Sequence, residues 1–79
     1  MKIEELMEIL DDCCNDVVFR HKGKDAGITA TVDKYVTTYQ IWYGENTKEF
    51  DNSVDVVYDP FFDGESIFDL IKTVEFNVL

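Results

Sequence analysis

Acidic residues between positions 51 and 59 have the spacing of a calcium-binding loop, which places oxygen ligands at its first, third, fifth and ninth positions. At those positions the chain supplies Asp51, Ser53, Asp55 and Asp59. However, Val56 stands where such a loop needs glycine, and Phe62 stands where it needs a bidentate glutamate. These departures leave at most a weak cation site, and we assign no metal or cofactor residue.

Nucleophilic catalysis is the second chemistry that the residue types suggest. It would need Cys13 or Cys14 beside a base, and His21 is the only histidine in the chain. His21 stands between Arg20 and Lys22, which is typical of a solvated hairpin residue. The adjacent cysteines have Cα atoms about 3.8 Å apart, closer than in ordinary disulfides. We therefore predict no enzyme, no catalytic residue and no disulfide within the chain.

A third pattern is a series of carboxylates in the second half of the chain. Its members are Glu45, Glu49, Asp51, Asp55, Asp59 and Asp63. The four aspartates recur every four residues, a rise of about 6 Å on a helix or about 13 Å on a strand, on the scale of phosphate separations in nucleic acids. Pro60 and Gly64 exclude one continuous helix across them. The alternative is that these residues serve caps, turns and solubility.

Trp42 is the aromatic residue that the pattern singles out. Side chains alternate along a strand, so in a strand over 35–43 Ile41 and Tyr43 face one side and Trp42 faces the other. An exposed tryptophan is typical of the centre of a binding patch. The alternative is that the C-terminal segment covers Trp42 and forms a second core with it.

The elements that would position these residues follow from apolar periodicity. Apolar residues from Ile3 to Cys14 recur every three or four positions and predict an amphipathic helix over about 2–14. Alternation then predicts a hairpin over 17–33 with its turn at 21–27, a third strand over 35–43 and a fourth over 47–50. The middle of the chain is therefore expected to form an antiparallel meander.

The last third of the chain predicts shorter elements. Ser53 can cap a short helix that ends before Pro60, and we prefer this to a strand over the same residues. Residues 61–64 predict a turn anchored by two buried rings, and Ser66 with Asp69 forms the capping box of another helix. Alternation over 74–78 predicts a closing strand. We expect an α+β fold: one antiparallel sheet of three to five strands, with an N-terminal and a C-terminal helix packed on it.

Composition and charge limit the partners. The chain has 79 residues, a net charge of −10 and 46% hydrophobic residues, enough to fold as one domain over 1–79. Most acids lie in 1–16 and 45–79, while 17–44 carries a small positive excess. Such a surface repels nucleic acids and membranes and attracts basic proteins. Without an apolar leader or a run of about 18 apolar residues, we expect a cytoplasmic protein.

In size, charge and the order of its helices and strands, the whole chain resembles the very small acidic α+β proteins that phages and mobile elements use against host nucleic-acid enzymes. This class includes uracil-DNA glycosylase inhibitors and several anti-CRISPR proteins. The resemblance involves no shared motif. It implies a non-enzymatic inhibitor that covers a basic nucleic-acid-binding surface of a partner protein by mimicking DNA or RNA.

The predicted contact residues lie on the first helix and in the acidic segment. They are Glu5, Glu8, Asp12, Glu45, Glu49, Asp51, Asp55 and Asp59, together with Trp42. We expect them to contact a basic protein surface, and we expect no direct binding to nucleic acid or membrane. The alternative function is a small adaptor or subunit that associates through an exposed aromatic patch around Trp42. The sequence leaves the oligomeric state open.

Overall fold

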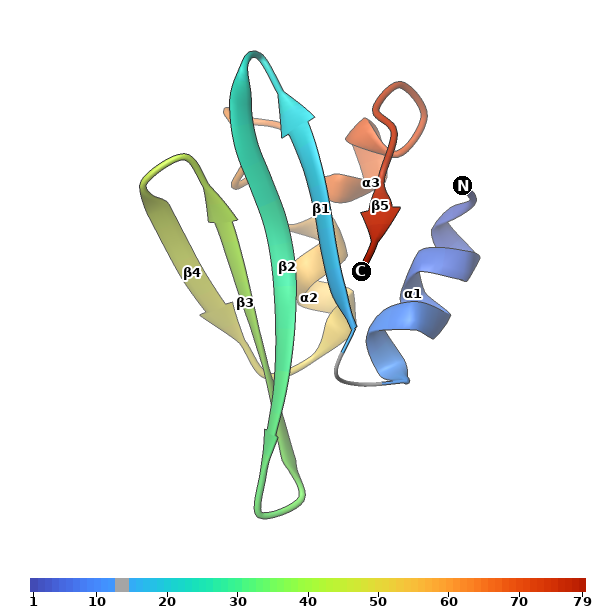
Figure 1. Ribbon diagram of the computed structural model, residues 1–79, viewed down its shortest axis with the longest axis vertical. Helices are drawn as coiled ribbons and strands as arrows, with labels where there is room; N and C mark the ends of the chain where they lie inside the picture. Colours follow the sequence, from blue (N-terminus) through green and yellow to red (C-terminus); the bar gives the residue numbers. More distant parts are fainter. Residues whose placement is uncertain (13–14) are drawn as a thin grey trace.

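Five strands form one antiparallel sheet in the computed structural model, which describes residues 1–12 and 15–79 (Figure 1). The strands are β1 (Asp16–His21), β2 (Lys24–Asp33), β3 (Val36–Tyr43), β4 (Asn46–Phe50) and β5 (Asn77–Val78). Their order across the sheet is β4-β3-β2-β1-β5, so that β1 to β4 form a meander and β5 pairs with the free side of β1. The predicted antiparallel sheet is confirmed.

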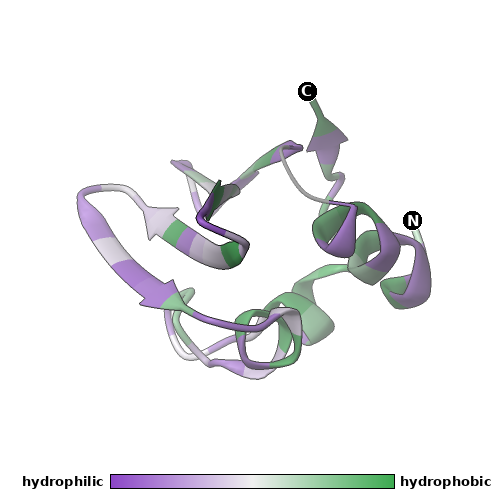
Figure 2. Ribbon diagram, turned by 90° about the horizontal axis from the view of Figure 1, so that it is seen from below, coloured by the Kyte–Doolittle hydropathy of each residue, from purple (hydrophilic) through white to green (hydrophobic). Residues whose placement is uncertain are grey.

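One face of the sheet is covered by α1 (Ile3–Asp11), α2 (Ser53–Tyr58) and α3 (Ile67–Leu70), as seen from below in Figure 2. The inward residues of the strands and the apolar faces of the helices form one buried cluster, in which Leu6, Ile41 and Phe62 are fully buried. Trp42 faces the opposite, open side of the sheet, as the alternation predicts. The predicted α+β architecture, with an N-terminal and a C-terminal helix on the sheet, is confirmed.

The first helix is shorter than predicted. It ends at Asp11, and the Asn15 side chain donates a hydrogen bond to the carbonyl of Ile9 (3.2 Å), which provides a partner near the helix end. The predictions for Cys13 and Cys14, namely a place on the helix, no disulfide and no nucleophilic role, concern residues outside the described part of the chain.

The predicted turn over 21–27 is wrong, because only Lys22 and Gly23 turn the chain and β2 already begins at Lys24. Lys22 and Gly23 both have positive φ, 52° and 78°, the pattern of the type I′ turn that suits a two-residue hairpin. Gly27 instead lies within β2, opposite Trp42, and a Cβ at this position would overlap the indole ring. This glycine therefore allows the close approach of an aromatic side chain and makes no turn.

The helix preferred over 53–58 is confirmed as α2, although its N-cap is Asn52. Asn52 Oδ1 accepts a hydrogen bond from the backbone N–H of Asp55 (2.8 Å). The hydroxyl of Ser53 is used differently: it donates to Asp11 Oδ1 at 2.9 Å and joins the start of α2 to the end of α1. The capping box of Ser66 and Asp69 is confirmed at α3.

The closing strand is shorter than predicted, because only residues 77 and 78 pair with β1. Phe76 leaves the sheet plane to stack on Phe19 in the core, with ring centroids 4.4 Å apart. The turn over 61–64 has one fully buried ring, Phe62, whereas Phe61 is half-buried. Burial of these rings therefore decides the path of the C-terminal third more strongly than strand alternation does.

Candidate binding surface

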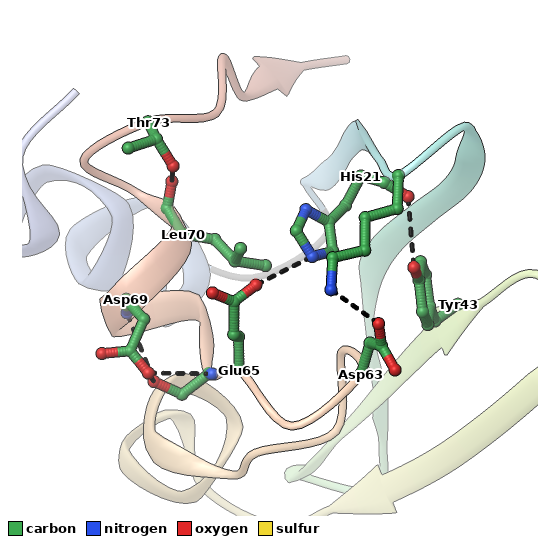
Figure 3. Close-up of polar contacts among 9 residues, drawn as sticks. His21, Tyr43, Asp63, Glu65, Asp69, Leu70 and Thr73 are labelled. Carbon is green, nitrogen blue, oxygen red and sulfur yellow. Dashed lines mark hydrogen bonds and ion pairs between the residues drawn. The ribbon is translucent and has the colours of Figure 1, made fainter.

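One end of the sheet, at the β1–β2 turn, is docked against the segment that joins α2 to α3 (Figure 3). Lys22 Nζ lies 2.7 Å from Asp63 Oδ2, and His21 Nε2 lies 2.9 Å from Glu65 Oε2. The Tyr43 hydroxyl donates a hydrogen bond to the His21 carbonyl (3.2 Å). We call this region, made by residues 20–25 and 61–66, the docked end.

The His21 side chain is only 11% exposed, so the prediction of a solvated hairpin histidine is wrong. Its contact with Glu65 has the distance of an ion pair but not the direction of a hydrogen bond. The ring also lies 5.9 Å from the ring of Tyr43, measured between centroids. His21 therefore helps to fasten the hairpin to the 61–66 segment, and none of these contacts places a nucleophile beside it.

Carboxylates at the docked end are neutralised within the protein. The Lys22 ammonium, through its hydrogen bond and its charge, lowers the pKa of Asp63 below the ordinary value, and Asp63 raises the pKa of Lys22 in the same way. Arg20 and Asp25 form a longer pair of 3.4 Å. Asp25 and Asp63 of this end therefore already have cationic partners, and Glu65 faces the His21 ring.

The opposite end of the sheet carries a projecting ribbon. β1 begins at Asp16, opposite Thr29, and β4 ends at Phe50, opposite Tyr39, whereas β2 and β3 continue beyond both. Residues 31–38 are thus a two-stranded hairpin without flanking strands, which extends beyond the other elements at the bottom of Figure 1. We call these residues the finger. Its tip exposes Val32, Tyr35 and Val36.

Five acids belong to the segments at the end of α1 and at the starts of β1 and α2, which lie near the base of the finger in Figure 1, and we call them the acidic collar: Asp11, Asp12, Asp16, Asp51 and Asp55. The end of α1 is held at this level of the sheet by the Tyr39 hydroxyl, which donates to the Leu10 carbonyl (3.2 Å). The hydrogen bond between Ser53 and Asp11 brings the start of α2 to the same place. None of the five acids forms an ion pair with a lysine or arginine in the described part of the chain.

The predicted contact residues fall into separate groups. Asp12, Asp51 and Asp55 come together in the collar, and Asn52 Nδ2 donates to both Asp51 (2.9 Å) and Asp55 (2.8 Å). Asp59, in contrast, is 21% exposed and pairs with Lys48 at 2.9 Å. Asp59 is therefore already engaged within the protein and is the weakest of the predicted contacts.

Of the other predicted acids, two lie beside the collar residue Asp12 and two lie at the far edge of the sheet. Glu5 and Glu8 border a shallow hollow of about 390 Å³ on α1, together with Asp12 and Ile9. Glu45, in the turn before β4, and Glu49, in β4, are both exposed, and β4 forms the edge of the sheet opposite α1 in both views (Figures 1 and 2). The acids of the first helix and those of β4 thus do not form one continuous surface.

Trp42 is half-buried, which places it between the two predicted alternatives. Its ring lies over Gly27 and borders a hollow of about 700 Å³ on the open face of the sheet. Residues 73–75 and Asn77 line the same hollow, so the C-terminal segment flanks the indole ring without forming a second core over it.

The collar residues Asp11 and Asp16 and the finger residue Tyr35 are absent from the predicted contact set. The sequence placed Tyr35 in a strand, because Lys34 and Tyr35 lack the glycine or asparagine that marks a hairpin turn. The projection of the finger follows from the lengths of β2 (10 residues) and β1 (6 residues), which the predicted turn over 21–27 concealed.

Within residues 1–12 and 15–79, no group of three or more His, Cys, Asp or Glu side chains is placed to hold a metal ion. The helices of this part of the chain are also too short to cross a bilayer. Comparisons of the chain with protein-family models, curated proteins and solved structures find no match. The function must therefore be argued from the surface itself.

Proposed function

We propose that this chain is a non-enzymatic acidic binding protein that covers a basic surface of a partner protein, with the acidic collar as its main contact. One observation supports the proposal: among the described residues, the acids at the docked end face basic side chains, and the collar acids at the finger end do not. At the docked end Asp25, Asp63 and Glu65 face Arg20, Lys22 and His21. At the finger end none of the five collar acids pairs with a described lysine or arginine.

The position of two of the collar acids, Asp11 and Asp12, makes their charges unfavourable for the free protein. Asp11 and Asp12 stand at the C-terminal end of α1, where the helix dipole disfavours negative charge, and the last turn contains no basic residue. Like charges that lie close together also repel one another. Cations from a partner would relieve both effects, which favours binding to a lysine- or arginine-rich surface.

We further propose that the basic surface of the partner normally binds DNA or RNA. A groove that binds phosphates attracts any rigid surface that offers several negative charges, and it carries few acids of its own. The collar offers such charges on residues fixed by α1, β1 and α2. By covering this groove, the protein would act as a competitive inhibitor of nucleic-acid binding.

The test compares two sets of three charge-neutralising substitutions. The collar set is Asp12→Asn, Asp51→Asn and Asp55→Asn, and the matched control set is Glu45→Gln, Glu49→Gln and Glu75→Gln, all exposed. Each protein is used to capture partners from extract of the native host cell, and the affinity of the recovered partner is measured from low to high salt. We expect the collar set to weaken binding about tenfold or more and to flatten the salt dependence.

The control set should change the affinity much less, and circular dichroism should show both sets folded. Equal effects of the two sets would refute the collar as the contact surface. A wild-type affinity that does not change with salt would refute the electrostatic mechanism altogether. Competition between the chain and a labelled oligonucleotide for the recovered partner tests whether the covered surface binds nucleic acid. If the chain and the oligonucleotide bind the partner at the same time, the proposed inhibition of nucleic-acid binding is wrong.

A second candidate function is association through Trp42, favoured by its half-exposed ring beside the hollow of about 700 Å³. In that case Trp42→Ala would abolish capture while the collar set retained it. Trp42→Phe keeps a ring over Gly27 and serves as the control for folding.

A further inference from the structure

The finger has a tight turn whose residues do not suit its backbone. Four two-residue turns occur among the described residues, and three of them place glycine at a position with positive φ: Gly23 (78°), Gly44 (60°) and Gly64 (84°). In the finger turn, Lys34 and Tyr35 have φ of 50° and 67° without any glycine. A bulky residue in this conformation is strained.

The strain is not balanced by packing within the domain. Tyr35 is fully exposed, and its neighbours Val32 and Val36 are 45% and 61% exposed. An aromatic ring held in a strained backbone without any contact in its own fold is a candidate for contact with another molecule. Tyrosine is also among the residues that contribute most strongly at the centres of protein interfaces.

We propose that the finger inserts Tyr35 into an apolar pocket of the partner protein, and that lysine and arginine residues around this pocket face the acidic collar. The charges of the finger and of the collar define this partner. Asp33 and Lys34 cancel at the tip, which leaves Tyr35, Val32 and Val36 as a neutral apolar surface. The base of the finger, in contrast, lies near the five collar acids, none of which forms an ion pair with a lysine or arginine within residues 1–12 and 15–79.

An apolar centre with a charged rim is the usual plan of a protein interface. The same arrangement disfavours two other molecules that could bind the finger, namely a nucleic acid and a second copy of this chain. A nucleic acid stacked on Tyr35 would bring its phosphates to the collar, and a second copy of this chain would add another net charge of −10. This inference rests on the proposed function, because the collar is what specifies a basic rim.

The first arm of the test measures binding to the partner recovered by the wild-type chain from host-cell extract. We expect Tyr35→Gly to lose about tenfold or more in affinity, with an unchanged salt dependence and a melting temperature that stays the same or rises. Tyr35→Phe should retain most of the affinity. The control Tyr58→Ala removes another exposed tyrosine, on α2, and should bind like the wild type.

The second arm places the photo-crosslinking residue p-benzoylphenylalanine at position 35 of the full chain in the same extract. A crosslink to an apolar segment of the partner with neighbouring lysines or arginines supports the inference. A crosslink to nucleic acid or to another copy of this chain, no crosslink, or full affinity of Tyr35→Gly overturns it.

The two proposals fail in different ways. If the collar set weakens binding and flattens the salt dependence while Tyr35→Gly binds normally, the finger proposal is wrong and the acidic-surface proposal stands. If Tyr35→Gly weakens binding while the collar set has no effect, the contact is apolar, and both the basic rim and the electrostatic function are wrong.

Discussion

The two ends of β2 contain the same kind of turn in opposite surroundings. Lys22 and Gly23 precede the strand, Lys34 and Tyr35 follow it, and all four residues have positive φ. The first turn is held by the 61–66 segment through Lys22 and Asp63, whereas the second projects into solvent with an exposed ring. The docked turn, which contacts the 61–66 segment, thus has glycine at its second position, where a positive φ causes no strain. The finger turn, which projects into solvent, has tyrosine at the same position, where a positive φ is strained.

The charges follow the same division. At the docked end Asp25 and Asp63 each have a cationic partner and Glu65 faces the His21 ring, whereas the collar acids have no lysine or arginine partner among the described residues. Both differences are the basis of our proposal that the finger end serves binding, whereas the docked end serves stability. This division of roles can be tested by the substitutions below.

The largest effect on stability should come from the core beneath the docked turn. Phe62 is fully buried and packs edge-on against Phe19 and Tyr43, with centroids 5.3 and 5.9 Å away. Phe62→Ala should lower the free energy of unfolding by about 3–5 kcal/mol, because it leaves a cavity, as measured by urea denaturation. Val36→Thr in the finger is the comparison and should change stability by less than about 0.5 kcal/mol.

If Val36→Thr proved as harmful as Phe62→Ala, the finger would belong to the folding unit. The proposed division between a stabilising end and a binding end would then be wrong.

The elements with strong local signals were predictable from the sequence. The spacing of Ser66 and Asp69 predicted the capping box of α3. The alternation of Ile41, Trp42 and Tyr43 predicted which side chains face each side of β3. The order of helices and strands followed from the same signals, because apolar periodicity reports burial directly. The fold class therefore needed no long-range information.

The parts that failed depend on contacts between distant residues. Gly27 looked like part of a turn, although its real constraint is the indole of Trp42 on the neighbouring strand. The engagement of Asp59 by Lys48 depends on how β4 meets α2. The four-residue spacing connects Asp51 with Asp55, but no local spacing connects them with Asp11 at the end of α1 or with Asp16 at the start of β1.

Exchanging the residue types at the second position of the two turns, Gly23 and Tyr35, tests the difference in backbone strain between the docked turn and the finger turn directly. Tyr35→Gly should raise the free energy of unfolding by up to about 1 kcal/mol, because glycine adopts positive φ without strain. Gly23→Tyr should lower it by about 1 kcal/mol, although a Cβ at Gly23 has open space around it. Urea denaturation of the two single variants and the double variant measures both effects.

The two effects should add in the double variant, because the turns lie at opposite ends of β2. If Tyr35→Gly destabilised the domain, the ring would have a structural role, and the strain in the finger could no longer be attributed to binding.

The smallest expected effect is the pH dependence of the ion pair at the docked turn. The pKa of Asp63 lies below its ordinary value of 3.8 because of Lys22, so this pair stabilises the fold above that value. The contribution should disappear as the pH falls through the lowered pKa of Asp63. The pKa of Lys22 is raised above its ordinary value of 10.5, so the pair contributes fully to stability below pH 10.5. This contribution disappears as the pH rises through the raised pKa of Lys22.

Both side chains of this pair are more than half exposed, 55% for Lys22 and 57% for Asp63, so solvent should keep the effect small. An NMR titration of the Asp63 carboxyl measures the shift directly, and Lys22→Met should return that pKa toward its ordinary value. Lys34→Met is the matched control in the finger turn and should leave the titration unchanged. If Lys34→Met moved the pKa of Asp63 as far as Lys22→Met does, the shift would arise from the overall charge of the protein, and the docked turn would have no local pairing to distinguish it from the finger.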